Sequence, residues 1–154
     1  MDNKLTTSKM LKKCLSLVIV CTIPILILFL ISIFIKKPLG NAIIYASIVI
    51  LAAGIFLFQL YELRCIICTV IDKSPFIEKN IKRFKNIGNC TFLLGIFNIL
   101  NNQHPKHFLI IIDLGFFSID NSIFIYIILG CLSLILAEIF KAALKIKNEN
   151  DLTI

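Results

Sequence analysis

The chain has 154 residues, of which 58% are hydrophobic and 16% are charged. A soluble domain carries about 25% charged residues, and disordered or collagen-like chains are poor in the aliphatic residues that dominate here, so the composition excludes all three classes. In so apolar a chain, the formal net charge of +7 reports first on orientation in a membrane. The composition predicts an integral membrane protein.

Apolar runs predict an all-α fold with four transmembrane helices in a single membrane domain. The first run, residues 14–35, is uncharged over 22 residues, which is about 33 Å of helix and matches a hydrocarbon core of about 30 Å. This run exceeds the apolar segment of a signal peptide and no cleavage site follows it, so we expect an uncleaved span. The other spans are expected at approximately residues 42–61, 87–103 and 120–144, of which the third is short.

The distribution of Lys and Arg predicts that both termini are cytoplasmic. Thirteen of the 16 basic residues precede the first span, lie between Arg64 and Lys85 or follow the last span, and three lie in the other two connections. Under the positive-inside rule, this split places the loop 62–86 and the tail 145–154 in the cytoplasm. It also requires two crossings after that loop, so we expect residues 108–119 to be an outer-surface or re-entrant segment.

A short helix is predicted inside the cytoplasmic loop. Ser74 can cap the first free N–H groups of a helix, and Pro75 fits the first helical position. Apolar residues then recur at helical spacing, with basic residues on the other faces. The apolar positions are Ile77, Ile81, Phe84 and Gly88, and the basic ones are Lys79, Lys82, Arg83 and Lys85.

Two interpretations of this basic amphipathic helix remain open. It can lie in the membrane interface, with its apolar face in the acyl boundary and its basic residues near anionic headgroups. Alternatively, the same face can dock a cytoplasmic partner. Direct binding of nucleic acid is not expected, because the basic patch is small and lies between spans.

Several motifs give the chain a resemblance to a known family. Residues 74–88 contain Pro-Phe-x-x-x-Asn-x-x-Arg-Phe-x-x-Ile-Gly, and residues 149–154 read Glu-Asn-Asp-Leu-Thr-Ile. With residues 61–64 and 136–140, these motifs resemble those of the bacterial membrane protein family called domain of unknown function 2975, in which Leu is usual at Phe84. The resemblance implies four spans in the bacterial cell membrane and no assigned biochemical activity. It also implies an association with small helix-turn-helix regulators of the Cro/CI type, which often appear beside family members.

The preferred functional hypothesis is a non-enzymatic membrane partner or regulator that presents the loop helix and the tail to a cytoplasmic protein, such as a small transcriptional regulator. The predicted partner-binding residues are Pro75, Phe76, Asn80, Lys82, Arg83, Ile87, Gly88, Glu149, Asp151 and Leu152. The alternative is a small oligomeric transporter or a toxin-immunity membrane protein with a polar path between its helices. A homo-oligomer is compatible with both hypotheses.

Three charged residues are expected within or at the boundary of the membrane, where ionisable groups are costly and often functional. They are Glu62, Arg64 and Glu138. For Glu138 the alternatives are an ion pair, with Lys141 on its own helix or with Arg64, and a gating or proton-linked role.

Motifs of catalysis and metal binding are not found in the sequence. It contains no Walker loop, HExxH, G-x-S-x-G or dinucleotide-binding fingerprint, so we expect no enzyme, no catalytic residues and no cofactor. Cys65 and Cys68 have CxxC spacing but lack a second pair of ligands, and His104, His107 and Asp113 make only a weak set, so no metal site is predicted.

Small residues form stripes on the second and fourth spans, which predicts close helix packing within the bundle or against another copy. The positions are Ala42, Ala46, Val49 and Ala53 on one helix and Gly130, Ser133 and Ala137 on the other.

Overall fold

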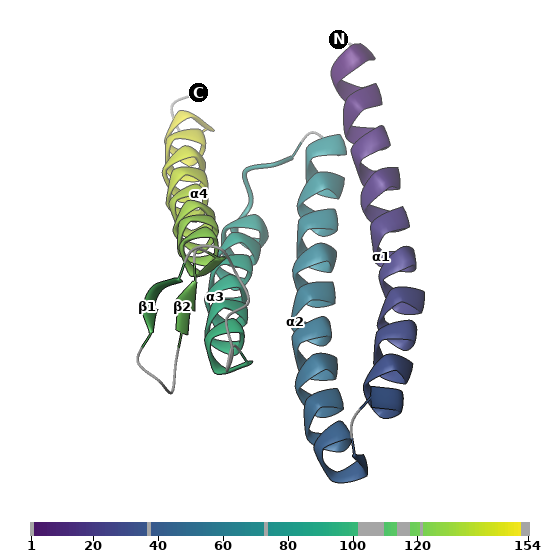
Figure 1. Ribbon diagram of the computed structural model, residues 1–154. Helices are drawn as coiled ribbons and strands as arrows, with labels where there is room; N and C mark the ends of the chain where they lie inside the picture. The colour runs from purple at the N-terminus through teal and green to yellow at the C-terminus, as the bar shows by residue number, and fades with distance from the viewer. Residues whose placement is uncertain are drawn as a thin grey trace. The chain divides into compact units, whose positions relative to one another are not determined.

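The computed structural model describes residues 2–36, 38–72, 74–101, 110–113, 118–120 and 122–151. In chain order the elements are α1 (Asp2–Lys36), α2 (Leu39–Ile71), α3 (Glu78–Asn101), β1 (Ile110–Asp113), β2 (Ser118–Asp120) and α4 (Ser122–Asp151) (Figure 1). The predicted helical class is confirmed. Among the described residues, three helices are long and apolar enough to cross a membrane, namely α1, α2 and α4.

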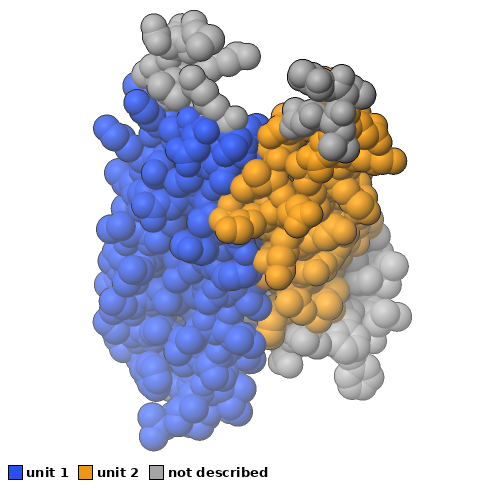
Figure 2. Space-filling model, turned by 180° about the vertical axis from the view of Figure 1, so that it is seen from behind, with its two compact units in different colours: residues 1–75 blue, residues 76–154 orange. Residues whose placement is uncertain are grey.

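The chain divides into two compact units, residues 1–75 and residues 76–154, which Figure 2 shows in different colours. In the first unit α1 and α2 form an antiparallel helical hairpin, and in the second unit α3 and α4 form another (Figure 1). Each hairpin therefore brings the beginning of one helix next to the end of the following helix.

Helix α2 is longer than the span expected at residues 42–61. It begins after Pro38, whose carbonyl accepts a hydrogen bond from the N–H of Ala42 at 2.9 Å, and it continues to Ile71. The first ten residues of the predicted loop 62–86 are therefore helical. No Gly or Pro lies between Gly54 and Pro75, and the charges of Glu62 and Arg64 do not interrupt the backbone hydrogen bonds.

The sequence predicted a short loop helix followed by a separate third span. The structure has one continuous helix, α3, in their place. It starts at Glu78 rather than at Ser74 and Pro75, and the carbonyl of Ile77 accepts hydrogen bonds from Asn80 N–H at 3.0 Å and Ile81 N–H at 3.4 Å. The amphipathic segment thus continues directly into the apolar one.

Glycines allow α3 and α4 to approach closely. A methyl group added at Gly130 would lie 2.6 Å from Cε1 of Phe92, and one added at Gly88 would lie 3.0 Å from Cγ of Leu134. At Gly95 the added methyl group would lie 3.1 Å from Cβ of Tyr126 on α4. The small-residue stripe predicted around Gly130 is therefore confirmed as a packing surface within the chain.

Other members of the predicted stripes are also buried. Ala42 and Ala46 of α2 and Ala137 of α4 expose almost no surface. Many large apolar side chains of α1, α2 and α4 are exposed instead, as expected for helices that face lipid.

A small antiparallel strand pair lies between α3 and α4 in sequence, and the all-α prediction did not include it. Strands β1 and β2 pair Ile110 with Asp120, Ile112 with Ile119 and Asp113 with Ser118, with an irregularity after Ile110. They lie in the segment 108–119 that was expected to be outer-surface or re-entrant. His104 and His107 lie outside the described residues.

The contact at Gly130 can be tested by adding one methyl group. Gly130→Ala should lower the free energy of unfolding by about 1 to 3 kcal/mol, because the methyl group would overlap the Phe92 ring. The measurement is a denaturant titration in detergent, followed by circular dichroism. Gly54→Ala is the matched control, since nothing lies within 4 Å of the added methyl group. Equal stability of the two variants would contradict the described packing.

Candidate functional site

One end of the α3–α4 hairpin is strongly basic. Because the helices are antiparallel, the start of α3 and the end of α4 lie at the same end of the hairpin (Figure 1). We call this the basic end and define it by six exposed lysines, namely Lys79, Lys82 and Lys85 of α3 and Lys141, Lys145 and Lys147 of α4.

Glu138 connects the two helices at the basic end. Its Oε1 lies 3.2 Å from Nζ of Lys85, and its Oε2 lies 3.7 Å from Nζ of Lys141. The ion pair predicted with Lys141 is confirmed. The pair with Lys85 was not predicted, because the place of Lys85 opposite Glu138 depends on the α3–α4 register. The side chains of Lys85 and Glu138 are 47% and 60% exposed, so water or headgroups screen the pair.

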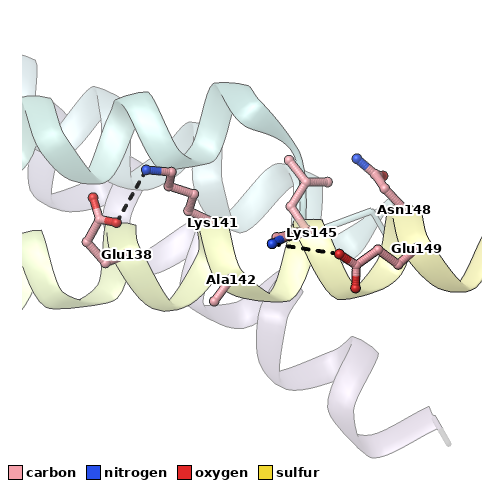
Figure 3. Close-up of a pocket in the computed structure, with 7 residues that line it drawn as sticks. Glu138, Lys141, Ala142, Lys145, Asn148 and Glu149 are labelled. Carbon is pink, nitrogen blue, oxygen red and sulfur yellow. Dashed lines mark ion pairs between the residues drawn. The ribbon is translucent and has the colours of Figure 1, made fainter.

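A second ion pair lies further along α4. Lys145 Nζ is 3.8 Å from Oε1 of Glu149, one helical turn away (Figure 3). Glu149, a predicted partner-binding residue, is exposed and engaged on its own helix. The side chain of Asp151 and all of Leu152 lie outside the described residues.

The apolar face of the predicted loop helix packs on α4. The rings of Phe76 and Phe84 lie 5.3 and 4.9 Å from the ring of Phe140, measured between centroids. Gly88 is buried against Leu134. The face expected to meet lipid or a partner is therefore covered by α4, although Phe76 keeps part of its surface exposed. The sequence did not indicate that Phe140 covers this face.

Two predicted partner-binding residues interact with each other. Asn80 is completely buried, and its Oδ1 accepts a hydrogen bond of 2.9 Å from Nη1 of half-buried Arg83. Pro75 and Ile87 are also half-buried. Of the predicted residues on this segment, Lys82 therefore offers the most accessible charge.

The charged residues of α2 belong to the first unit. Glu62 is buried and Arg64 is half-buried near the end of α2. Cys65 and Cys68 follow them as free, half-buried thiols. These groups belong to the unit of residues 1–75 and Glu138 belongs to the unit of residues 76–154, so a pair between Arg64 and Glu138 stays a prediction.

An open hollow of about 530 Å³ lies along the last turns of α4 (Figure 3). The described residues that line it are Glu138, Lys141, Ala142, Leu144, Lys145, Asn148 and Glu149. They combine charge with aliphatic surface, and none of them is a Ser, Thr or Cys. Within the part of the chain that the structure describes, no three His, Cys, Asp or Glu side chains are grouped so that they could hold a metal ion.

Sequence comparison identifies the family of this chain. The family model described as "Protein of unknown function (DUF2975)" matches residues 18–154. The chain belongs to this family. The match confirms the resemblance carried by residues 74–88 and covers nearly the whole chain, so we describe the molecule as a DUF2975 multi-pass membrane protein. No curated protein and no solved structure matches it.

The Asn80–Arg83 hydrogen bond gives a second prediction for this DUF2975 protein. Asn80→Leu should lower the free energy of unfolding by about 1 to 3 kcal/mol, because the half-buried guanidinium of Arg83 loses a close acceptor. Lys82→Gln, an exposed change on the same turn, should stay within about 0.5 kcal/mol of the parent chain. Denaturant unfolding in detergent measures both, and an undiminished stability of Asn80→Leu would mean that this hydrogen bond contributes nothing.

Proposed function

We propose that this DUF2975 protein is a non-enzymatic regulator in the bacterial cell membrane that holds an acidic cytoplasmic protein at the bilayer through the basic end. The observation that carries the proposal is the concentration of accessible positive charge there. Residues 78–85 and 138–150 contain seven basic and three acidic side chains. Lys79 and Lys82 are exposed and form no ion pair with any described residue.

The proposed topology has four crossings with both termini in the cytoplasm. Helices α1 and α2 are antiparallel and each is long enough to cross, so they return the chain to its starting side at Ile71. Helix α3 begins seven residues later, a connection too short for another helical crossing, so the proposal assigns its start to that side. Helix α4 runs back antiparallel to α3. The excess of Lys and Arg on the proposed inner side supports a cytoplasmic assignment.

Helix α3 is the least apolar of the four, yet its packing supports a crossing. Its buried positions include Gly88, Thr91 and Gly95, and the two glycines contact α4. The large side chains that it exposes beyond the basic end include Leu93 and Ile96. Gly88, Thr91 and Gly95 are thus shielded from lipid, as in other transmembrane helix pairs, whereas the polar Asn89 is exposed one turn beyond Lys85.

The chemistry of the basic end favours a protein partner with an acidic surface. Clustered positive charge accelerates encounter with such a surface and fixes its orientation. The family resemblance associates such proteins with small helix-turn-helix regulators, which supports a regulator as the partner. Binding at the membrane would control where that regulator is, so no chemical step is needed.

A transport function receives less support. It requires polar side chains inside the bundle at mid-depth, whereas the buried polar side chains among the described residues are Glu62, Asn80 and Thr91. The Thr91 hydroxyl donates to the Ile87 carbonyl of its own helix at 2.8 Å. Glu62 and Asn80 lie toward the helix ends that the proposal places at the cytoplasmic side.

The topology predicts the behaviour of reporter fusions. Green fluorescent protein fused after Ile71 or Asp151 should fluoresce, because both sites are cytoplasmic. Alkaline phosphatase fused after Lys36 or Asn101 should be active, because both sites are outside. An inactive phosphatase after Asn101, together with an active one after Lys36, would remove the third and fourth crossings from the proposal.

Charge reversal tests the docking surface. Lys79→Glu/Lys82→Glu should reduce the recovery of the cytoplasmic partner by at least about tenfold, since attraction becomes repulsion at two exposed positions. The measurement is cross-linking in intact cells, affinity purification from membranes and quantitative mass spectrometry. A chain lacking residues 148–154 tests the contribution of the tail in the same way.

The matched control is Lys9→Glu/Lys13→Glu, which reverses two exposed lysines at the start of α1. This variant has the same net charge and the same proposed side of the membrane, so it should retain the partner. If both variants lose the partner equally, the effect is a general effect of charge. If both variants recover as much partner as the parent chain, the basic end is not the docking surface.

A further inference from the structure

The α3–α4 hairpin has a defined register between two polar contacts. At the basic end, Glu138 pairs with Lys85 at 3.2 Å. At the other end, the Ser122 hydroxyl donates to Oδ1 of Asn98 at 3.1 Å. The close glycine contacts described above lie between these two points, so the helices pack continuously from one polar contact to the other.

The distance between these contacts is short for a membrane. Lys85 and Asn98 are 13 residues apart on α3, and Ser122 and Glu138 are 16 residues apart on α4. At 1.5 Å per residue, these separations correspond to about 20 and 24 Å, whereas a hydrocarbon core is about 30 Å thick. The uncharged run 14–35 of α1 is about 33 Å long by the same measure.

The basic end cannot easily move into the hydrocarbon. Its Glu138 side chain is 60% exposed, and a carboxylate on two methylene groups reaches less far toward water than a lysine does. Exposed charges at membrane depth are costly, so the Lys85–Glu138 pair marks the inner boundary of the apolar layer.

The opposite end is limited by backbone rather than by charge. Strand β2 ends at Asp120, two residues before Ser122, and in the described residues β1 and β2 form a sheet of only two strands. Open sheet edges do not occur in lipid-exposed hydrocarbon, because their N–H and C=O groups would lack partners. The level of Asn98 and Ser122 therefore marks the outer boundary.

We propose that the bilayer around the α3–α4 hairpin is thinned to about 20 to 24 Å, and that this hairpin is an interaction surface for the acyl chains of a thin bilayer. The inference rests on the crossing of α3 and α4 proposed above and is independent of the docking partner. Helix tilt would shorten the apolar layer further, so tilting cannot correct this mismatch.

The test is the water accessibility of single thiols in the full-length chain. Asn98→Cys and Ile99→Cys place thiols at the proposed outer boundary, and Ile99→Cys preserves the Asn98–Ser122 hydrogen bond. Leu93→Cys is the control, because Leu93 is exposed and lies between the two boundaries. Right-side-out membrane vesicles are treated with a membrane-impermeant maleimide, and modified thiols are counted by gel shift.

The native cysteines give a low background from the outside. Cys21, Cys90 and Cys131 lie in apolar runs, and Cys14, Cys65 and Cys68 lie toward the proposed inner side. We expect the thiol at residue 98 or 99 to react at least about tenfold faster than the thiol at residue 93, because maleimide reacts with a thiolate in water.

Each other outcome overturns the proposal in a distinguishable way. If residues 98 and 99 are as protected as residue 93 from both sides, the hydrocarbon extends beyond them, so the bilayer is not thinned although α3 enters it. If they react only in inverted vesicles, α3 does not cross, and both the thinning and the four-span topology fail. Detergent chromatography of each variant confirms that the reported thiol is in a folded chain.

Discussion

The contact of the Phe92 ring with Gly130 is the constraint on which the second unit depends. Because Gly130 has no side chain, the ring can lie against the backbone of α4, and the two helices pack at short range. This contact sets the register of the hairpin. The register in turn brings Lys85 of α3 to Glu138 of α4 and gathers the lysines of both helices at one end.

The two hairpins differ in how they use their surfaces. The α1–α2 hairpin exposes long aliphatic stretches and carries few charges between its ends, which suits a membrane anchor. The α3–α4 hairpin combines a shorter apolar layer with a charged end, and the hydrogen bond from Arg83 to buried Asn80 stabilises the start of α3. The proposed recognition surface accordingly lies on the second hairpin.

The long helices could be predicted from the sequence because uncharged runs such as residues 14–35 specify both length and environment. The packing of α3 on α4 could not be predicted in this way. Helical periodicity places Phe84 and Gly88 on one face of α3, but it does not show that Phe140 and Leu134 cover that face. Likewise, Lys141 was predictable as a partner of Glu138 from its spacing on one helix, whereas Lys85 required the register between two helices. The strands β1 and β2 lie in an apolar segment whose sequence does not distinguish them from other membrane-associated structure.

The division of the chain at residues 75 and 76 has a consequence for biosynthesis. Within each unit, the two helices that pack together follow one another in sequence, so α1 and α2 can associate before α3 has left the ribosome. The Glu138 carboxylate, however, is made more than fifty residues after Lys85. During translation the lysines of α3 are therefore present without that counterion, and in the proposed topology this interval leaves them as an uncompensated positive cluster next to the end of α2, which favours their retention on the cytoplasmic side.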